Sequence, residues 1–270
     1  MTATVVAFAL VPITGAYAQG VLLRVHPRVG DTLHTRLEQQ SEINATVGSP
    51  GRTVKSVVSS VMLTSRTIVQ ASSPASSMVL TIVDSAVLRT SDAHGAAQVA
   101  AAERSLKGQQ LLLQLGADGT VESARDSRGA PMPREVADAM AAMPAVFPRR
   151  PVSVGEQWTR ELPLPARGPL GTRGGGHVDA VFRLDSLDRS GQVAFVSMRG
   201  EIMSDGAGQA VQFSGGVSGA MQVDRRRGWM TDSRFTVLIR SQVTPAPSSG
   251  LAPMRFVTRL TQRLRTMDKR

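Results

Sequence analysis

Most of the chain alternates between apolar and polar residues with a period of two, which is the pattern of antiparallel strands that bury one face. From Leu33 to Val47 the odd positions are mostly apolar, and the even positions carry Arg, Glu, Gln and Asn. This pattern predicts a strand with one solvent-exposed face. The same pattern predicts strands at Val54–Gln70, Met78–Thr90, Leu111–Leu115, Thr120–Glu122, Glu156–Leu162, His177–Ser186, Gln192–Ser204, Ala210–Val223, Trp229–Gln242 and Arg255–Thr266. The last of these also fits helical spacing, but its threonines favour a strand.

Helical signals are few. Residues 133–143 open on Pro, carry acidic residues in the first turns and stop before Pro144, which predicts a short helix. Met140 and Met143 share one face of it, so we expect the helix to cap the sheet. Its methionines are either core residues or part of a lid over a ligand. Ala96–Ser105 is ambiguous and also fits a short helix.

A short repeat divides the chain. The segment Val29-Gly30-Asp31-Thr32-Leu33 resembles Val154-Gly155-Glu156-Gln157-Trp158, since each reads Val-Gly-acid with a bulky apolar residue two places later. Glycine provides the bend that starts a strand. The prediction is a mainly β protein with two β lobes, residues 19–148 (with the helix near 133–143) and 149–270. Its sheet is expected to be strongly curved and antiparallel, as a half-barrel or a two-lobed sandwich-like arrangement with one or two short helices.

Residues 1–18 are predicted to be a secretory signal peptide. They contain an apolar stretch and no charge, and Ala16-Tyr17-Ala18 places small residues before a cleavage site at Gln19. The lack of Lys or Arg near Met1 departs from that pattern, and a buried strand or an uncleaved membrane anchor are the alternatives. Export would place the protein in the periplasm, either soluble or peripherally attached to a membrane.

The charge balance limits the classes of binding partner that we expect. Lys and Arg total 31 against 21 Asp and Glu, giving a net charge of +10, and almost all the cations are Arg. Aromatic residues make up only 4% and the Arg residues are scattered, which disfavours nucleic-acid binding. An anionic membrane or an acidic protein surface fits better, and the run Arg225-Arg226-Arg227 is a candidate for that contact.

Candidate chemistry is sparse. The chain has no Cys, which excludes thiol nucleophiles, Cys-ligated zinc and lipidation at a Cys. No catalytic motif or metal-spaced histidine set is found, so we predict no catalytic residue, metal or cofactor. Trp158 and Trp229 each begin a predicted strand. A Trp buries a large area while its indole N–H seeks a partner, so each either packs in the core or lines a binding pocket.

Several segments together resemble a known group. The leader, the Val29–Leu33 start, the Pro151–Trp158 centre and the Gly219–Trp229 hairpin resemble an uncharacterised family of bacterial exported proteins. More distantly, they resemble the periplasmic lipoprotein-carrier-like half-barrels. The resemblance implies a curved sheet, partly closed around an apolar concavity and lidded by a helix, and it carries over no active residues.

The expected function is non-catalytic binding of an apolar ligand such as a lipid, or of a protein partner, at the periplasmic side. One alternative is an accessory subunit docked on the periplasmic face of a respiratory or photosynthetic membrane complex. A second is an enzyme whose site is assembled from dispersed residues.

Overall fold

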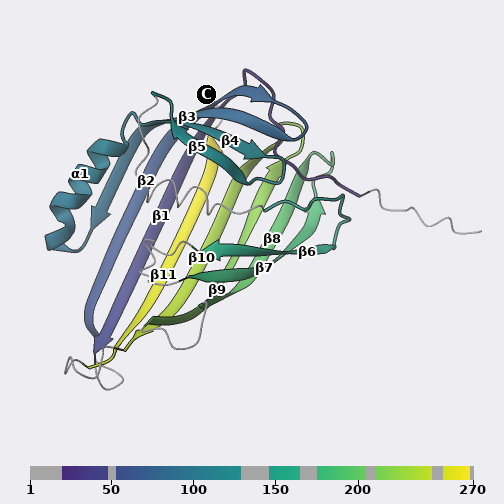
Figure 1. Ribbon diagram of the computed structural model, residues 1–270. Helices are drawn as coiled ribbons and strands as arrows, with labels where there is room; N and C mark the ends of the chain where they lie inside the picture. Colours follow the sequence, from purple (N-terminus) through teal and green to yellow (C-terminus); the bar gives the residue numbers. More distant parts are fainter. Residues whose placement is uncertain are drawn as a thin grey trace, which may run out of the picture.

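The computed structural model describes residues 20–47, 53–128, 146–164, 175–204, 211–244 and 252–267. Its strands form one 11-stranded antiparallel sheet that is curled and unclosed (Figure 1). The strands are β1 (Thr32–Val47), β2 (Thr53–Ser72), β3 (Ser76–Thr90), β4 (Gln110–Gly116), β5 (Val121–Asp126), β6 (Gln157–Leu164), β7 (Gly176–Leu187), β8 (Val193–Ser204), β9 (Val211–Asp224), β10 (Trp229–Val243) and β11 (Met254–Met267). The predicted mainly β fold is confirmed, and each strand predicted from the alternation corresponds to one of these.

The strand order is β5-β4-β3-β2-β1-β11-β10-β9-β8-β7-β6. The chain therefore forms two meanders, β1–β5 and β6–β11, which join where the first strand pairs with the last. This seam runs from His34 opposite Met267 to Val47 opposite Met254. The two expected lobes, 19–148 and 149–270, contribute the two meanders of one continuous sheet.

The sequence repeat forms the same turn twice. Gly30 and Gly155 have φ values of +87° and +88°, in the left-handed region that favours glycine. The amide of Gly30 donates to the carbonyl of Val69 (2.9 Å), and the amide of Gly155 donates to the carbonyl of Leu184 (2.6 Å). Each turn thus ties the start of a meander to the strand that pairs with it.

Helix α1 (Ala96–Leu106), which follows a 3-10 turn at Ala93–Gly95, shows that the segment 96–105, which the sequence left ambiguous, is a short helix. It lies beside β3, and the Glu103 carboxylate accepts a hydrogen bond from the Leu88 amide at 3.0 Å. The predicted helix at 133–143 and the predicted leader at 1–18 lie outside the described residues. Within the described parts of the chain, no helix is long and apolar enough to cross a bilayer.

The register separates charge between the two faces of the four central strands β2, β1, β11 and β10. On what we call the inner face, the described side chains of these strands are uncharged, except for Lys55 at the tip of β2, which pairs with Asp92. On the opposite, outer face the strands carry nearly all their charge. The inner-face residues include Leu37, Gln39, Ser41, Ile43, Ser59, Val61, Leu63, Phe235, Val237, Ile239, Thr258, Leu260, Gln262 and Leu264; the outer-face charges are Arg36, Glu38, Glu42, Arg66, Asp232, Arg234, Arg240, Arg255, Arg259, Arg263 and Arg265.

The sheet curls around its inner face. Leu115 of β4 packs against the core cluster that contains Trp158 of β6, although these strands lie near opposite ends of the strand order. Residues 146–147 connect the same two regions. The Phe147 amide donates to the Asp118 carbonyl in the β4–β5 turn (3.1 Å), and the Trp158 indole donates to the Val146 carbonyl (3.0 Å).

An extended segment before β1, residues 20–31, closes one end of the curl; we call it the plug segment. Its backbone hydrogen bonds join it to separate parts of the fold. Val21 forms a β-bridge with Val152, and the Val25 amide donates to the carbonyl of Ala117 at 2.8 Å. Leu23, at 1% exposure, is part of the core cluster. Because side chains alternate along an extended chain, the plug segment buries one side and leaves the other in solvent.

Candidate functional site

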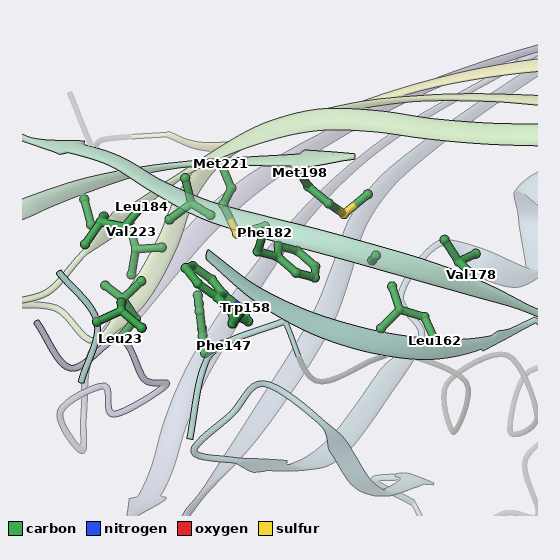
Figure 2. Close-up of a cluster of buried hydrophobic side chains, with 14 of the residues drawn as sticks. Leu23, Phe147, Trp158, Leu162, Val178, Phe182, Leu184, Met198, Met221 and Val223 are labelled. Carbon is green, nitrogen blue, oxygen red and sulfur yellow. The ribbon is translucent and has the colours of Figure 1, made fainter. Parts of the chain in front are cut away.

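The first candidate residue, Trp158, lies in the core cluster (Figure 2). Its ring stacks on Phe182, with the centroids 5.6 Å apart and 10° between the ring planes. Its indole N–H donates to the carbonyl of Val146. Both its apolar surface and its polar group are therefore satisfied within the protein, which is the geometry of a core residue rather than of a ligand contact.

The second tryptophan, Trp229, begins β10 opposite Asp224 and is half-buried, packed against the same core cluster. It lies directly after the β9–β10 turn. The other apolar candidates, Met140 and Met143, lie outside the described residues.

The run Arg225-Arg226-Arg227 forms the exposed β9–β10 turn. The Asp224 carboxylate holds this turn, accepting from the amides of Arg226 (3.0 Å) and Arg227 (2.9 Å) and pairing with the Arg227 guanidinium at 3.6 Å. The Arg225 guanidinium donates to the carbonyl of Gly191. The backbone of the turn is thus fixed by its own acid, a common role of Asp in turns.

The fold places these arginines next to cations that sequence reasoning missed. A hollow of about 400 Å³, which we call the arginine pocket, lies between the plug segment and the β9–β10 turn. Its lining residues are Leu22, Arg24, His26, Arg28, Val223, Arg225, Arg226 and Gly228. No carboxylate is among them. Arg227 lines a neighbouring hollow instead, together with Asp31 and His34.

A larger hollow of about 650 Å³ crosses the outer face of the central strands. One row of its lining is small or neutral, from Ser60 and Gln40 to Thr261. Charged residues flank that row: Glu38, Arg89, Arg234 and Arg263. Of these arginines, Arg263 pairs with Asp232 at 3.4 Å, whereas Arg89 and Arg234 have no acid within 4 Å in the described chain.

The inner face of the central strands has the opposite character. Leu63, Leu37 and Leu264 lie directly across from one another on β2, β1 and β11, and each is only partly buried. None of the three belongs to the core cluster, which is drawn from the plug segment, residues 147–152 and strands β6 to β10. The central strands therefore have apolar surface on their inner face that is not buried against this cluster.

Among the described residues, two carboxylates have a lowered pKa, and both stabilise turns. The pKa of Glu156 is lowered because its carboxylate accepts a hydrogen bond from the Ser153 amide and one from Arg150. The pKa of Asp188 is lowered by the Ser190 hydroxyl and by the amides of Val193 and Gln192. Neither carboxylate lines the hollows described above. In the described ranges, no group of three or more acids and histidines is arranged to hold a metal.

Comparison with known proteins does not identify a function for this chain. No family model matches the chain, and no curated protein matches it. Among solved structures, DynF from the dynemicin biosynthesis pathway of Micromonospora chersina is 9% identical, with a TM-score of 0.23, over 96% of this chain and 93% of that one. An outer membrane channel from Pseudomonas putida F1 is 9% identical, with a TM-score of 0.20, over 94% of this chain and 100% of that one. OprG from Pseudomonas aeruginosa is 10% identical, with a TM-score of 0.15, over 90% and 98%. Likenesses this distant do not identify a function for this chain.

Proposed function

We propose that this protein is an exported, non-catalytic binding protein that holds an apolar molecule of lipid size against the inner face of its curled sheet. The observation that carries this proposal is the row of Leu63, Leu37 and Leu264. These leucines face the inside of the curl on three neighbouring strands, yet they remain partly exposed and outside the core cluster.

The distribution of charge supports the same function. Apart from Lys55 at the tip of β2, the described charged side chains of the central strands lie on the outer face. An apolar ligand beside the leucine row therefore meets only apolar and neutral polar groups of these strands. Apolar walls with a few neutral polar groups are typical of small-molecule sites. Gln39 and Gln262, opposite each other on β1 and β11, lie on the same face two residues from the leucine row.

Export is supported by the sequence of residues 2–18, with its uncharged apolar stretch and its small residues before Gln19. The plug segment follows that predicted cleavage site in the sequence.

The outer face supports a second function, that of an accessory subunit docked against an acidic surface of a membrane complex. Arg234, Arg240, Arg255 and Arg259 lie on one face of β10 and β11, and none has an acid within 4 Å in the part of the chain that is described. An excess of positive charge on a broad face steers association with an acidic surface.

The test of ligand binding uses a neutral apolar dye, N-phenyl-1-naphthylamine, so that the arginines do not contribute. We expect the dye to brighten on binding to the wild-type protein, and we expect Leu63→Gln to weaken binding about tenfold, since it replaces a partly buried apolar side chain with an amide.

The matched control is Met62→Gln, the adjacent residue on the outer face. It should bind dye as the wild type does. Leu264→Gln, on a different strand, repeats the test if Leu63→Gln folds poorly. Equal binding by the inner-face and outer-face variants, or no binding by the wild type, would exclude the inner face as an apolar site.

A further inference from the structure

The arginine pocket joins two segments that are distant in the sequence. Arg24 and Arg28 come from the plug segment, and Arg225 and Arg226 come from the β9–β10 turn. These four arginines line one hollow of about 400 Å³.

Backbone contacts hold these two segments together. The His26 amide donates to the carbonyl of Gly228 at 3.0 Å. A Cβ atom at Gly228 would collide with the His26 carbonyl group, so the plug segment approaches the turn as closely as glycine allows. The Gly191 carbonyl also anchors the Arg225 guanidinium. The backbone on both sides of the hollow is therefore held in place before any ligand arrives, which lowers the cost of binding.

Among the described residues, no acidic group neutralises the arginines of the pocket. Its lining includes no carboxylate, and no acid lies within 4 Å of the guanidinium groups of Arg24, Arg28, Arg225 or Arg226 within the described residues. The one acid of the turn, Asp224, is already engaged by two backbone amides and by Arg227. Like charges gathered in a small hollow repel one another, and an anion that enters relieves the repulsion.

We propose that the arginine pocket binds a phosphate group, either as free phosphate or as a phosphate ester. Guanidinium forks match the oxygens of phosphate in pairs, so arginines from two sides of a hollow hold a tetrahedral oxyanion better than a monovalent halide. The volume lies within the range of about 300 to 1,000 Å³ usual for small-molecule sites, which leaves room for the group that carries the phosphate. This inference stands independently of the apolar site on the inner face.

The first experiment titrates the intact protein with inorganic pyrophosphate and with inorganic phosphate by calorimetry, at an ionic strength held constant with potassium chloride. Constant ionic strength removes the general screening effect. We expect saturable binding of the wild type and at least about a tenfold loss of affinity in the double variant R24Q/R226Q, because two charge-assisted contacts are lost.

The matched control is R89Q/R259Q, which removes the same charge from the outer face. It should bind as the wild type does. An equal loss in both double variants would show diffuse attraction to the net charge and overturn the proposal, and so would the absence of saturable binding in the wild type. Arg226 is exposed and Arg24 half-buried at the surface, and matched melting temperatures confirm that both variants fold.

A second experiment distinguishes the sources of the phosphate. Vesicles of phosphatidylglycerol in phosphatidylcholine are sedimented with the wild type and with R24Q/R226Q. Retention that depends on Arg24 and Arg226 and is competed by pyrophosphate identifies a lipid headgroup. Binding of soluble phosphate with no such retention identifies a soluble ester. Retention equal in R24Q/R226Q and R89Q/R259Q, together with no saturable phosphate binding, counts against the pocket.

Discussion

The ring of Trp158 stacks on the ring of Phe182, with centroids 5.6 Å apart, and this pair joins the edge strand β6 to the core. The same indole donates to the Val146 carbonyl, so one side chain both fills the core and holds the chain segment that links the two ends of the curl.

Replacement of Trp158 separates these two roles. We expect Trp158→Ala to lower the free energy of unfolding by about 3 to 5 kcal/mol because it leaves a cavity. Trp158→Phe retains an aromatic ring but leaves the Val146 carbonyl without its donor, and it should cost about 1 to 3 kcal/mol. Denaturant unfolding monitored by circular dichroism measures both. A phenylalanine variant as unstable as the alanine variant would show that the hydrogen bond, rather than the buried area, dominates.

The plug segment offers a test with two adjacent leucines. Leu23 is 1% exposed and Leu22 is 40% exposed. Leu23→Ala should lower the free energy of unfolding by about 2 to 5 kcal/mol, whereas Leu22→Ala should change it by no more than about 0.5 kcal/mol. An effect of Leu23→Ala as small as that of Leu22→Ala would mean that the plug segment is not part of the cooperative fold.

Two glycines with positive φ are predicted to differ in their tolerance of a side chain. Gly30 has φ +87° and open space where a Cβ would lie, whereas Gly228 has φ +59° and a Cβ there would collide with the His26 backbone. Gly30→Ala should cost about 1 to 2 kcal/mol for its left-handed backbone. Gly228→Ala carries a comparable backbone cost and a further overpacking cost of about 1 to 3 kcal/mol. Thermal melts of the two variants compare them directly, and a Gly228→Ala protein as stable as Gly30→Ala would contradict the close approach of the plug segment.

The turn at Asp188 predicts a specific pH dependence. Its pKa is lowered from the ordinary value of 3.8, chiefly by the Ser190 hydroxyl. A carboxyl whose folded pKa is lowered adds stability that is fully present above its unfolded pKa and is lost as the pH falls through the folded value. Asp188→Asn should therefore be less stable than the wild type at pH 7, and the difference should shrink as the pH falls below 3.8. Urea unfolding at several pH values measures this, and a difference that does not change with pH would show that the charge of Asp188 plays no part.

The alternating pattern predicted the strands well because it depends on local chemistry. Residues 33–47 alternate so regularly that the strand and its two faces follow from the sequence, and β1 spans Thr32–Val47. The repeated Val-Gly-acid motif likewise predicted two equivalent strand starts, since Gly30 and Gly155 adopt nearly the same φ.

The order of the strands in the sheet and the arginine pocket could not be predicted from local sequence patterns. The pairing of β1 with β11 depends on contacts between the two ends of the chain, and no local pattern specifies it. Arg24 and Arg28 lie in an extended segment without a regular strand, so nothing in the sequence indicated that they meet Arg225. For Trp158 the sequence left core and pocket open, because the partner of its indole N–H, the Val146 carbonyl, belongs to a separate segment.

The seam between β1 and β11 has a consequence for how the protein is made. During synthesis β1 emerges early, whereas its partner along the seam, β11, is the last of the described strands to appear. Until then, β1 presents an unpaired edge with free backbone amides and carbonyls, which invites pairing with other chains. Contacts so distant along the chain also slow folding. We therefore expect the nascent polypeptide to depend on a holding chaperone until β11 is available to pair with β1.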